Sequence, residues 1–299
     1  MSEIVSNMEQ RTINITDSII DSKAGDMKAS ENTNQIKLKV TGVNKIFTAK
    51  GKHGQEIVAL QDISLEVRKS EFVVIVGPSG CGKSTLLNII GGLEESTEGV
   101  VEIDDKMVTG PGADRGMVFQ GYSLFPWLTV QKNVEFGLKM RGIPRQERSR
   151  TAQEYIHLVG LDDFKNALPG QLSGGMKQRV AIARTLANHP EVLLMDEPFG
   201  ALDAQTRVVM QELLARISRE TKNTILFITH DIDEAILLGN RIYIMSRRPG
   251  TMREVLDVNL SGERNHEILV TPEFLKIKQK IMNMLWEESL EASMESTMG

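Results

Sequence analysis

The chain contains 299 residues, of which 40 % are hydrophobic and 25 % are charged, and its formal net charge is −5. This composition is typical of a globular protein and excludes the collagen-like, disordered and disulfide-scaffold classes. The single cysteine also excludes an intramolecular disulfide and a cysteine-rich zinc site. The acidic balance gives no electrostatic reason to expect nucleic acid, and the longest apolar runs are far shorter than the roughly 20 residues that cross a bilayer. Composition therefore predicts a soluble, cytosolic protein.

The first 35 residues are rich in Ser, Asn, Asp and Glu. Their isoleucines are scattered, and no basic segment precedes an apolar run, so this region lacks the pattern of a signal peptide. We expect a solvated, disordered tail at residues 1–35, with a binding segment as the alternative.

Strand patterns begin at residue 36. Alternating apolar and polar residues predict strands at 36–47 and 56–67, separated by a turn-rich segment. The uninterrupted apolar run at 72–76 predicts a buried strand, and helical spacing at 83–90 predicts a helix directly after it. Further short strands are expected at 100–103, 116–119, 192–195, 224–228 and 241–245. Strands interleaved with helices predict an α/β fold.

Between Thr129 and Ala187 the sequence pattern changes from mainly strand-like to helical. Helical spacing predicts helices at 130–140, 145–159 and 176–187, which together form a helical block inserted into the α/β chain. Proline at the first helical position predicts that a last helix begins at Pro272. One face of that helix is expected to carry Phe274, Ile277, Ile281 and Leu285.

Residues 77–84 read GPSGCGKS and fit the pattern of a phosphate-binding loop. Such a loop points several backbone N–H groups at one anion, which requires small residues and positive φ angles. The N-terminus of the following helix adds its dipole. Lys83 is expected to reach the β- and γ-phosphates of a nucleotide, and the Ser84 hydroxyl to hold Mg²⁺. A glycine-rich turn without function is the alternative, but the loop lies between a predicted strand and a predicted helix, where the chemistry needs it.

Asp196 and Glu197 follow the apolar run at 192–195. The carboxyl ends of strands in open α/β sheets are where ligands bind, so we expect both carboxylates at the nucleotide. Asp196 is expected to act on magnesium, and Glu197 to orient or deprotonate the attacking water. A solvated pair at a loop end is the alternative.

Cys81 and His230 each have a structural and a functional interpretation. Cys81 lies in the phosphate loop, where a redox role is conceivable, but the motif only requires a small residue there. His230 follows the predicted strand at 224–228 and is either structural or a contact to the γ-phosphate. The other four histidines show no ligand spacing, so we predict no metal site formed by the protein alone.

The octet LSGGMKQR at 172–179 closely resembles the signature motif of ATP-binding cassette (ABC) ATPases, and that family's other motifs are present in order. The resemblance covers roughly residues 37 to 250. It implies an α/β P-loop NTPase (RecA-like) core with an antiparallel β subdomain and an inserted α-helical subdomain at about 121–187. On this basis we expect an ABC ATPase domain at 36–270 and a C-terminal helical tail at 271–299.

The resemblance also implies residue roles. Phe47 matches the aromatic residue that stacks on adenine, where the family more often has tyrosine. Gln120 matches the Q-loop glutamine that touches Mg²⁺ and faces the partner subunit. Asp203 matches the D-loop aspartate, and His230 matches the H-loop histidine.

Three groups of residues are therefore expected around ATP and Mg²⁺. The nucleotide contacts are Phe47, Gly77, Pro78, Ser79, Gly80, Cys81, Gly82, Lys83, Ser84, Thr85 and Gln120. The metal contacts are Ser84, Gln120 and Asp196. The catalytic residues are Glu197, His230 and Lys83.

The signature motif implies a second copy of the chain. Ser173, Gly174 and Gly175 begin a helix and form a second anion-binding helix N-terminus, which one triphosphate does not need. In the family this segment, here including Gln178, closes on the γ-phosphate held by the opposite protomer. The resemblance therefore implies a head-to-tail homodimer with two ATP molecules in its interface.

A narrower resemblance comes from LFPWLTV at 124–130, NVEFGL at 133–138 and RRPG at 247–250. These segments look like the nitrate/sulfonate/taurine importer ATPases. The chain is accordingly expected to be the ATP-binding subunit of an importer, peripheral on the cytoplasmic face of the cell membrane through a separate permease. A solute-binding protein would be an indirect partner. The solute stays open among an oxyanion, a sulfonate, taurine and a thiamine-precursor-like molecule.

Several alternatives accompany this interpretation. Phe125, Trp127 and Phe136 are either core residues of the helical block or a socket for a partner helix. The arginines at 141–150 form either a solvated face or a surface near lipid headgroups. The alternative function is a soluble, non-transport ABC ATPase that acts on nucleic acid or ribosomes. Such proteins generally carry two cassettes, coiled-coil insertions or basic surfaces, so we expect no nucleic-acid partner.

Overall fold

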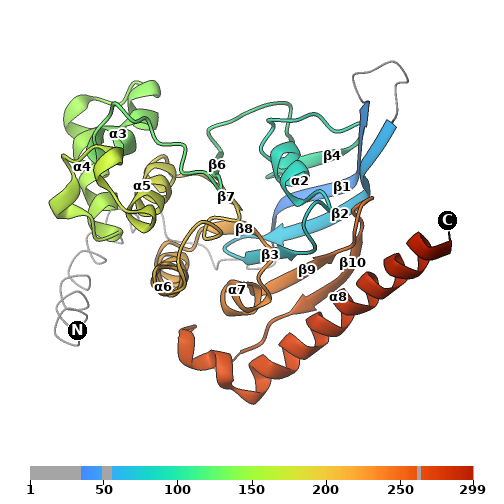
Figure 1. The fold of residues 1–299 in the computed structure, drawn as a ribbon. Helices are drawn as coiled ribbons and strands as arrows, with labels where there is room; N and C mark the ends of the chain where they lie inside the picture. The colour runs from blue at the N-terminus through green and yellow to red at the C-terminus, as the bar shows by residue number, and fades with distance from the viewer. Residues whose placement is uncertain (1–34, 49–55, 261–263, 299) are drawn as a thin grey trace. The chain divides into compact units, whose positions relative to one another are not determined.

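The computed structural model describes residues 35–48, 56–260 and 264–298, with side chains described as far as Trp286. Apart from Gln35, the tail expected at residues 1–35 lies outside the described residues. The described residues from 35 onward contain two sheets, a group of helices joined to one of them, and a long final helix (Figure 1).

The first sheet is antiparallel and has the strand order β2-β1-β4-β5. Its strands are β1 (Ile36–Thr48), β2 (Glu56–Arg68), β4 (Glu98–Ile103) and β5 (Lys106–Met107). Apolar residues at alternate positions of β1 and β2, such as Leu38, Val40 and Leu65, are buried on one face, as the alternating pattern predicts. The two-residue strand β5 was not predicted.

The second sheet has six strands in the order β10-β9-β3-β8-β7-β6. Five of them run parallel, and they are β3 (Phe72–Val76), β6 (Arg115–Val118), β7 (Val192–Asp196), β8 (Thr224–Thr229) and β9 (Arg241–Met245). The edge strand β10 (Met252–Asp257) pairs antiparallel with β9 and was not predicted. Buried parallel strands read as continuous apolar runs, which is why the sequence identifies all five.

Alternate residues of β3 point to two different cores. Val73 and Ile75 pack with the antiparallel sheet and with α2 (Lys83–Ile90). Phe72 and Val74 pack on the other face, where α6 (Ala204–Thr221) and α7 (Ile232–Leu238) lie. The sheet is therefore covered on both sides (Figure 1). Neither α6 nor α7 was predicted.

The predicted helical block is present as α3 (Val130–Met140), α4 (Arg145–Leu158) and α5 (Gly174–Leu186). Short 3-10 turns at Asp162–Phe164 and Pro169–Gln171 connect α4 to α5. Asn133 of α3 is fully buried and fixes the preceding loop, because its amide nitrogen donates to the carbonyls of Phe125, Leu128 and Thr129.

The last helix, α8 (Pro272–Met298), begins at the predicted proline after a 3-10 turn at His266–Val270. Phe274 and Ile281 are buried, and Ile277 and Leu285 pack against the same core, so the predicted apolar face is confirmed. Trp286 on this helix is 68 % exposed. Among the described residues, no helix has the length and hydropathy needed to cross a membrane.

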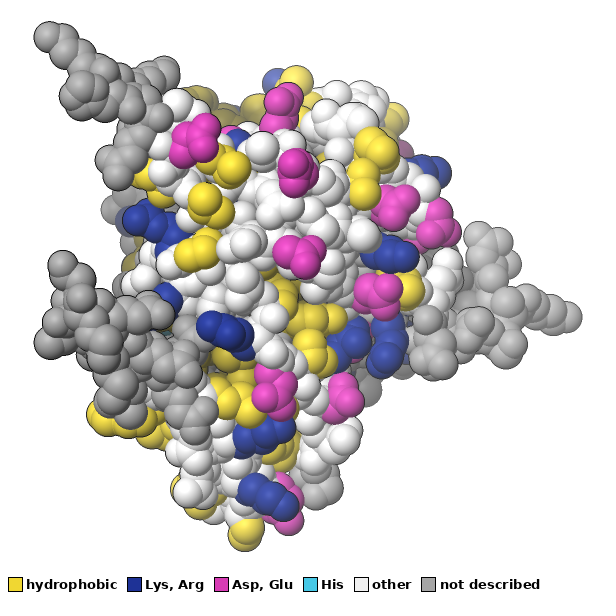
Figure 2. All heavy atoms as spheres, turned by 90° about the vertical axis from the view of Figure 1, so that its right-hand side faces the viewer, with side chains coloured by type: hydrophobic (Ala, Val, Ile, Leu, Met, Phe, Trp, Pro, Cys, Tyr) yellow, Lys and Arg dark blue, Asp and Glu magenta, His cyan; other side chains and the backbone are white. Residues whose placement is uncertain are grey.

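One face of the surface is shown in Figure 2, seen from the right-hand side of Figure 1. Lysine and arginine side chains alternate there with aspartate and glutamate, and hydrophobic side chains lie between them. The described residues on that face do not gather into a single basic patch, in keeping with the net charge of −5.

Candidate active site

The phosphate loop lies between β3 and α2, as the sequence predicts. Gly80 and Gly82 have φ angles of +78° and +108°, a left-handed conformation that glycine adopts without strain. A Cβ atom at Gly77 would lie 2.7 Å from the Met245 carbonyl oxygen of β9. Both the turn and its close approach to the sheet therefore require glycine at these positions.

Lys83 is turned into this loop and is only 5 % exposed. Its Nζ atom donates to the carbonyl oxygens of Gly77 at 2.8 Å and Pro78 at 3.0 Å. The ammonium group therefore lies inside the ring of backbone that a phosphate-binding loop forms, where it can supply positive charge to a bound anion.

Asp196 ends β7, and its side chain meets the first turn of α2. Ser84 Oγ donates to Asp196 Oδ1 at 2.9 Å. Burial raises the pKa of Asp196, and the nearby Glu197 carboxylate raises it further, while the hydrogen bond from Ser84 opposes the shift. A hydroxyl and a carboxylate placed together are hard oxygen ligands, so this pair fits Mg²⁺.

Glu197 and His230 are brought together by neighbouring strands, because β7 pairs with β8 in parallel register. Glu197 adopts a φ of +42°, and its backbone N–H donates to the Ile228 carbonyl oxygen at 3.0 Å. His230 Nδ1 lies 3.0 Å from Glu197 Oε2. The side chain of His230 is 55 % exposed and that of Glu197 is 19 % exposed, so the histidine is the more solvent-accessible member of the pair.

Gln120 follows β6 and lies at the same edge of the sheet. A Cβ atom at Gly200 would lie 3.4 Å from Gln120 Nε2 and 3.8 Å from Glu197 Oε2, so the amide and the carboxylate both lie beside Gly200. Three adjacent strands, β6, β7 and β8, therefore deliver the predicted polar residues to one edge, where α/β sheets bind ligands.

Phe47 lies at the end of β1, on the antiparallel sheet. Its side chain is 38 % exposed, and Lys45 Nζ lies 4.8 Å from the ring centroid. The neighbouring strand β2 approaches the phosphate loop, because a Cβ atom at Gly82 would lie 3.0 Å from the Ala59 carbonyl oxygen. The ring is therefore accessible on the sheet that borders the loop, as a stacking residue must be.

The signature segment begins α5. Ser173 caps the helix, and its hydroxyl accepts from the Met176 N–H at 3.3 Å. A Cβ atom at Gly174 would lie 2.8 Å from the Tyr122 hydroxyl oxygen, and one at Gly175 would collide with the Thr206 methyl group. The two glycines thus permit close packing against these side chains.

One predicted signature residue is placed differently. Gln178 is fully buried, and neither of its amide atoms has a hydrogen-bond partner. Its position one turn into α5 directs the side chain inward, so the expectation that Gln178 faces a nucleotide on another protomer does not hold in this conformation.

The D-loop lies beside the signature segment. Asp203 caps α6 and accepts from the backbone N–H of Thr206 at 3.0 Å and from its hydroxyl at 2.7 Å. These hydrogen bonds lower the pKa of Asp203. Thr206 was missed in the sequence analysis although the Asp-x-x-Thr spacing is an N-cap signal, and its methyl group joins this loop to Gly175.

Cys81 is buried within the loop and is 1 % exposed. Burial raises the pKa of its thiol, and the nearby Lys83 ammonium only partly opposes this. A buried thiol with a raised pKa is a poor nucleophile, which favours the small-residue interpretation.

A groove of about 670 Å³ lies on the helical block. Trp127, 72 % exposed, lines it together with Phe136 and several charged residues. The ring centroids of Phe125 and Phe136 are 4.3 Å apart, and that of Trp127 is 5.8 Å from Phe125. Phe125 and Phe136 therefore support a tryptophan that projects to the surface, which favours the socket interpretation.

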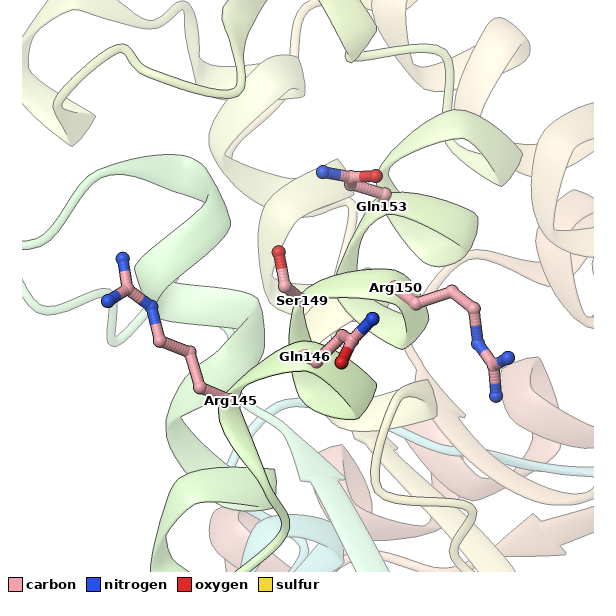
Figure 3. A pocket seen from close by; sticks show the side chains of 5 residues that line it. All are labelled: Arg145, Gln146, Ser149, Arg150 and Gln153. Atoms are coloured by element: carbon pink, nitrogen blue, oxygen red, sulfur yellow. The ribbon is translucent and has the colours of Figure 1, made fainter.

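A second, shallower hollow of about 450 Å³ lies on α4 (Figure 3). All five residues that line it belong to this one helix, and Arg145 and Arg150 point away from each other. Arg148 and Arg150 form ion pairs with Glu135 at 3.3 Å and Glu154 at 3.8 Å. This arrangement is that of a solvated helix face. Among the described residues, no group of three or more His, Cys, Asp and Glu could hold a metal ion.

Comparisons with known proteins show the family of the chain. A family model described as "ABC transporter" matches residues 60–200. The chain is 52 % identical over 254 residues to the nitrate import ATP-binding protein NrtD of Synechocystis sp., covering 83 % of this chain and 94 % of that protein. It is 45 % identical over 240 residues to the taurine import ATP-binding protein TauB of Roseobacter denitrificans, covering 79 % and 89 %.

A solved structure is also similar. It is the dimeric ATP-binding cassette MJ0796 in a post-hydrolysis state bound to ADP and Pi. The TM-score is 0.64 at 38 % sequence identity, and the match covers 75 % of this chain and 99 % of that one.

Proposed function

The chain belongs to the ABC transporter family and is an ATPase of that family, and on this premise we propose that it drives solute import. In this proposal it is the ATP-binding subunit of an importer, works as a head-to-tail homodimer and acts on a separate membrane permease. The solute class is nitrate-, sulfonate- or taurine-like, since relatives named for nitrate and taurine import match over most of their length.

The observation that carries the catalytic part is the pairing of Glu197 with His230 beside Ser84 and Asp196. In this proposal Glu197 takes the proton of an attacking water, and His230 holds that carboxylate in position. Lys83 and the N–H groups of the loop would hold the phosphates. Ser84, Asp196 and Gln120 would hold Mg²⁺, which supplies charge neutralisation to the terminal phosphates.

The dimer follows from the position of the signature segment. Ser173–Gly175 begin a helix whose first turn carries no acidic residue, and Ser173 is exposed, which supports binding of an anion from outside the chain at this positive end. The similar cassette MJ0796 is itself a dimer. A nucleotide held by one protomer would then be closed over by the signature segment of the other.

The permease partner is supported by the groove around Trp127. An exposed tryptophan backed by two phenylalanines and rimmed by charged side chains has the composition of a docking surface. The subunit would then lie on the cytoplasmic face of the membrane, held there by the permease. A solute-binding protein would contribute only indirectly, through that permease.

Co-purification tests the importer assignment. The chain is expressed together with a candidate importer permease from the same organism, and we expect a stable complex whose ATPase rate depends on the permease. Trp127→Ala should weaken the association about tenfold or more, as is usual for an interface tryptophan. Met140→Ala is the matched control, because Met140 is 71 % exposed on the same helical block but does not line the groove.

Two results would contradict the assignment. Failure of the unchanged chain to associate with any membrane permease would remove the importer function. Stimulation of its ATPase rate by nucleic acid or ribosomes would favour the soluble alternative, for which the mixed charges in Figure 2 offer no support.

A further inference from the structure

The short helix α7 fixes the backbone on both sides of His230. Asp231 caps α7 and accepts from the N–H groups of Asp233 at 2.9 Å and Glu234 at 3.2 Å. The buried Glu234 carboxylate reaches back and accepts from the Thr229 hydroxyl at 2.7 Å. The position of α7 therefore determines where the residues flanking His230 lie, and with them the imidazole that meets Glu197.

A half-buried arginine from the C-terminal segment, Arg264, contacts the C-terminal end of α7. Arg264 Nη1 donates to the carbonyl oxygens of Ile236 at 2.8 Å, Leu237 at 3.2 Å and Gly239 at 2.8 Å. Carbonyls at a helix C-terminus lack partners within the helix and carry its negative dipole, so a guanidinium there satisfies and neutralises them. Burial lowers the pKa of Arg264, but the group remains charged.

A lysine of α8 holds the near end of α7. Lys278 Nζ donates to Asp233 Oδ2 at 2.8 Å, in the first turn of α7. Between these two polar contacts, Phe274 and Ile281 of α8 are buried in the same core as Ala235, Ile236 and Leu238 of α7. The two helices lie side by side (Figure 1), so the C-terminal segment contacts α7 at both ends and along its length.

We propose that this C-terminal segment, residues 264–281, is a positioning clamp for His230. Arg264 and Lys278 fix the position of α7. Helix α7 in turn fixes Thr229 and Asp231. These two residues flank His230 and keep it at hydrogen-bond distance from Glu197. Arg264 and Lys278 would act through α7, which both of them contact, and not on the nucleotide directly. The inference rests on the proposed function, because it assigns these two positioning residues to the same hydrolysis reaction.

Two lysines of α8 supply a matched test. Lys278 pairs with Asp233 of α7, whereas Lys280, two residues along the helix, pairs with Glu254 of β10 at 2.7 Å. Lys278→Met should lower kcat about two- to threefold, in line with the small contribution of a partly exposed ion pair, and Lys280→Met should not change it. ATP affinity should be the same in both, because α7 does not form the phosphate loop.

Arg264 should give the larger effect. Arg264→Met removes the donors while keeping most of the apolar volume, and we expect kcat to fall about fivefold or more at unchanged ATP affinity. Arg264→Lys, which keeps the charge, should restore part of the rate. The imidazole NMR signals of His230, assigned by comparison with His230→Gln, should shift in Arg264→Met and stay in place in Lys280→Met.

The outcomes separate this inference from the proposed function. The inference is overturned if Lys278→Met and Lys280→Met behave alike, or if Arg264→Met changes the melting temperature but neither kcat nor the His230 signals. It is also overturned if kcat and ATP affinity fall together, since that pattern indicates general loosening of the fold. Failure of the unchanged chain to hydrolyse ATP would instead remove the proposed function.

Discussion

The two parts of the chain that we propose contact nucleotide differ in how many of their polar groups already have hydrogen-bond partners. At the edge of the parallel sheet, Lys83, Ser84 and Asp196 already have hydrogen-bond partners, and Glu197 is paired with His230. At the start of α5, Ser173 makes one long capping bond and is exposed, while Gly175 is buried. The first part is built by neighbouring strands. The second is built by a helix N-terminus without an acidic residue of its own.

This difference separates the residues proposed for ATP binding and hydrolysis from the residues proposed to bring two protomers together. In the proposed function, the sheet edge supplies the groups that bind phosphate and activate water, so its variants should change binding or turnover in each protomer. The signature segment contains only an anion-binding N-terminus, so its variants should change how two protomers come together. The predictions below test that separation.

The largest effect is expected for Glu197→Gln. The amide keeps the size of the side chain and its polar contact to His230 but cannot take a proton, so kcat should fall about a thousandfold. ATP binding should be intact, and an ATP-bound dimer should accumulate in size-exclusion chromatography. Hydrolysis at the unchanged rate would show that Glu197 is not the base.

Lys83→Ala should fail at an earlier step. It removes the buried ammonium group from the phosphate loop, and loss of charge-assisted hydrogen bonds to phosphate should weaken ATP binding about ten- to a hundredfold. Equilibrium binding of a fluorescent ATP analogue measures this. A normal Kd with a reduced rate would instead assign Lys83 to the chemical step alone.

Ser173→Arg should leave ATP binding and the hydrolytic groups of the monomer unchanged. A large cation at the start of α5 would block access to the helix N-terminus, so the dimer-dependent ATPase rate should fall about tenfold. Cooperativity in ATP should disappear, while monomer binding persists.

Gln153→Arg is the control for added charge, because Gln153 is exposed on α4 in the same helical block. It should behave as the unchanged chain does. Cooperative hydrolysis in Ser173→Arg would show that the signature segment does not act between protomers.

The smallest effect is expected for Cys81→Ala. If the loop requires only a small residue there, kcat and ATP affinity should each change less than about twofold. In the unchanged chain, alkylation at neutral pH should be slow and should accelerate as the pH rises, because burial raises the pKa of the thiol. Rapid alkylation at neutral pH would contradict the buried position.

The parts of the site that were predictable are those encoded in continuous sequence. The phosphate loop, the strand before it and the helix after it depend on neighbouring residues only, and the structure has them where the pattern predicts. The meeting of Glu197 with His230 depends on β7 and β8 being adjacent, which no local pattern specifies. The family resemblance led us to expect both residues at the nucleotide, but neither it nor the spacing of residues predicted their hydrogen bond to each other.

The helices and the buried residue that the sequence did not predict also have physical explanations. On α6, Val208 and Val209 are both exposed, which blurs the apolar stripe that would indicate a helix. The helix α7 has seven residues, too few for a periodic pattern to emerge. The motif around Gln178 specifies a residue type but not which face of α5 turns inward, so its burial could not be read from the sequence.

The exposure of both tryptophans has a practical consequence for following this protein in solution. The sequence contains two, Trp127 on the helical block and Trp286 on α8, and each side chain is largely in water. Indole emission shifts to shorter wavelength when water is excluded, so Trp286→Phe leaves an emitter that reports contact at the groove. Trp127→Phe leaves one that reports events on the last helix. Intrinsic fluorescence can thus follow the two surfaces separately, without an attached label.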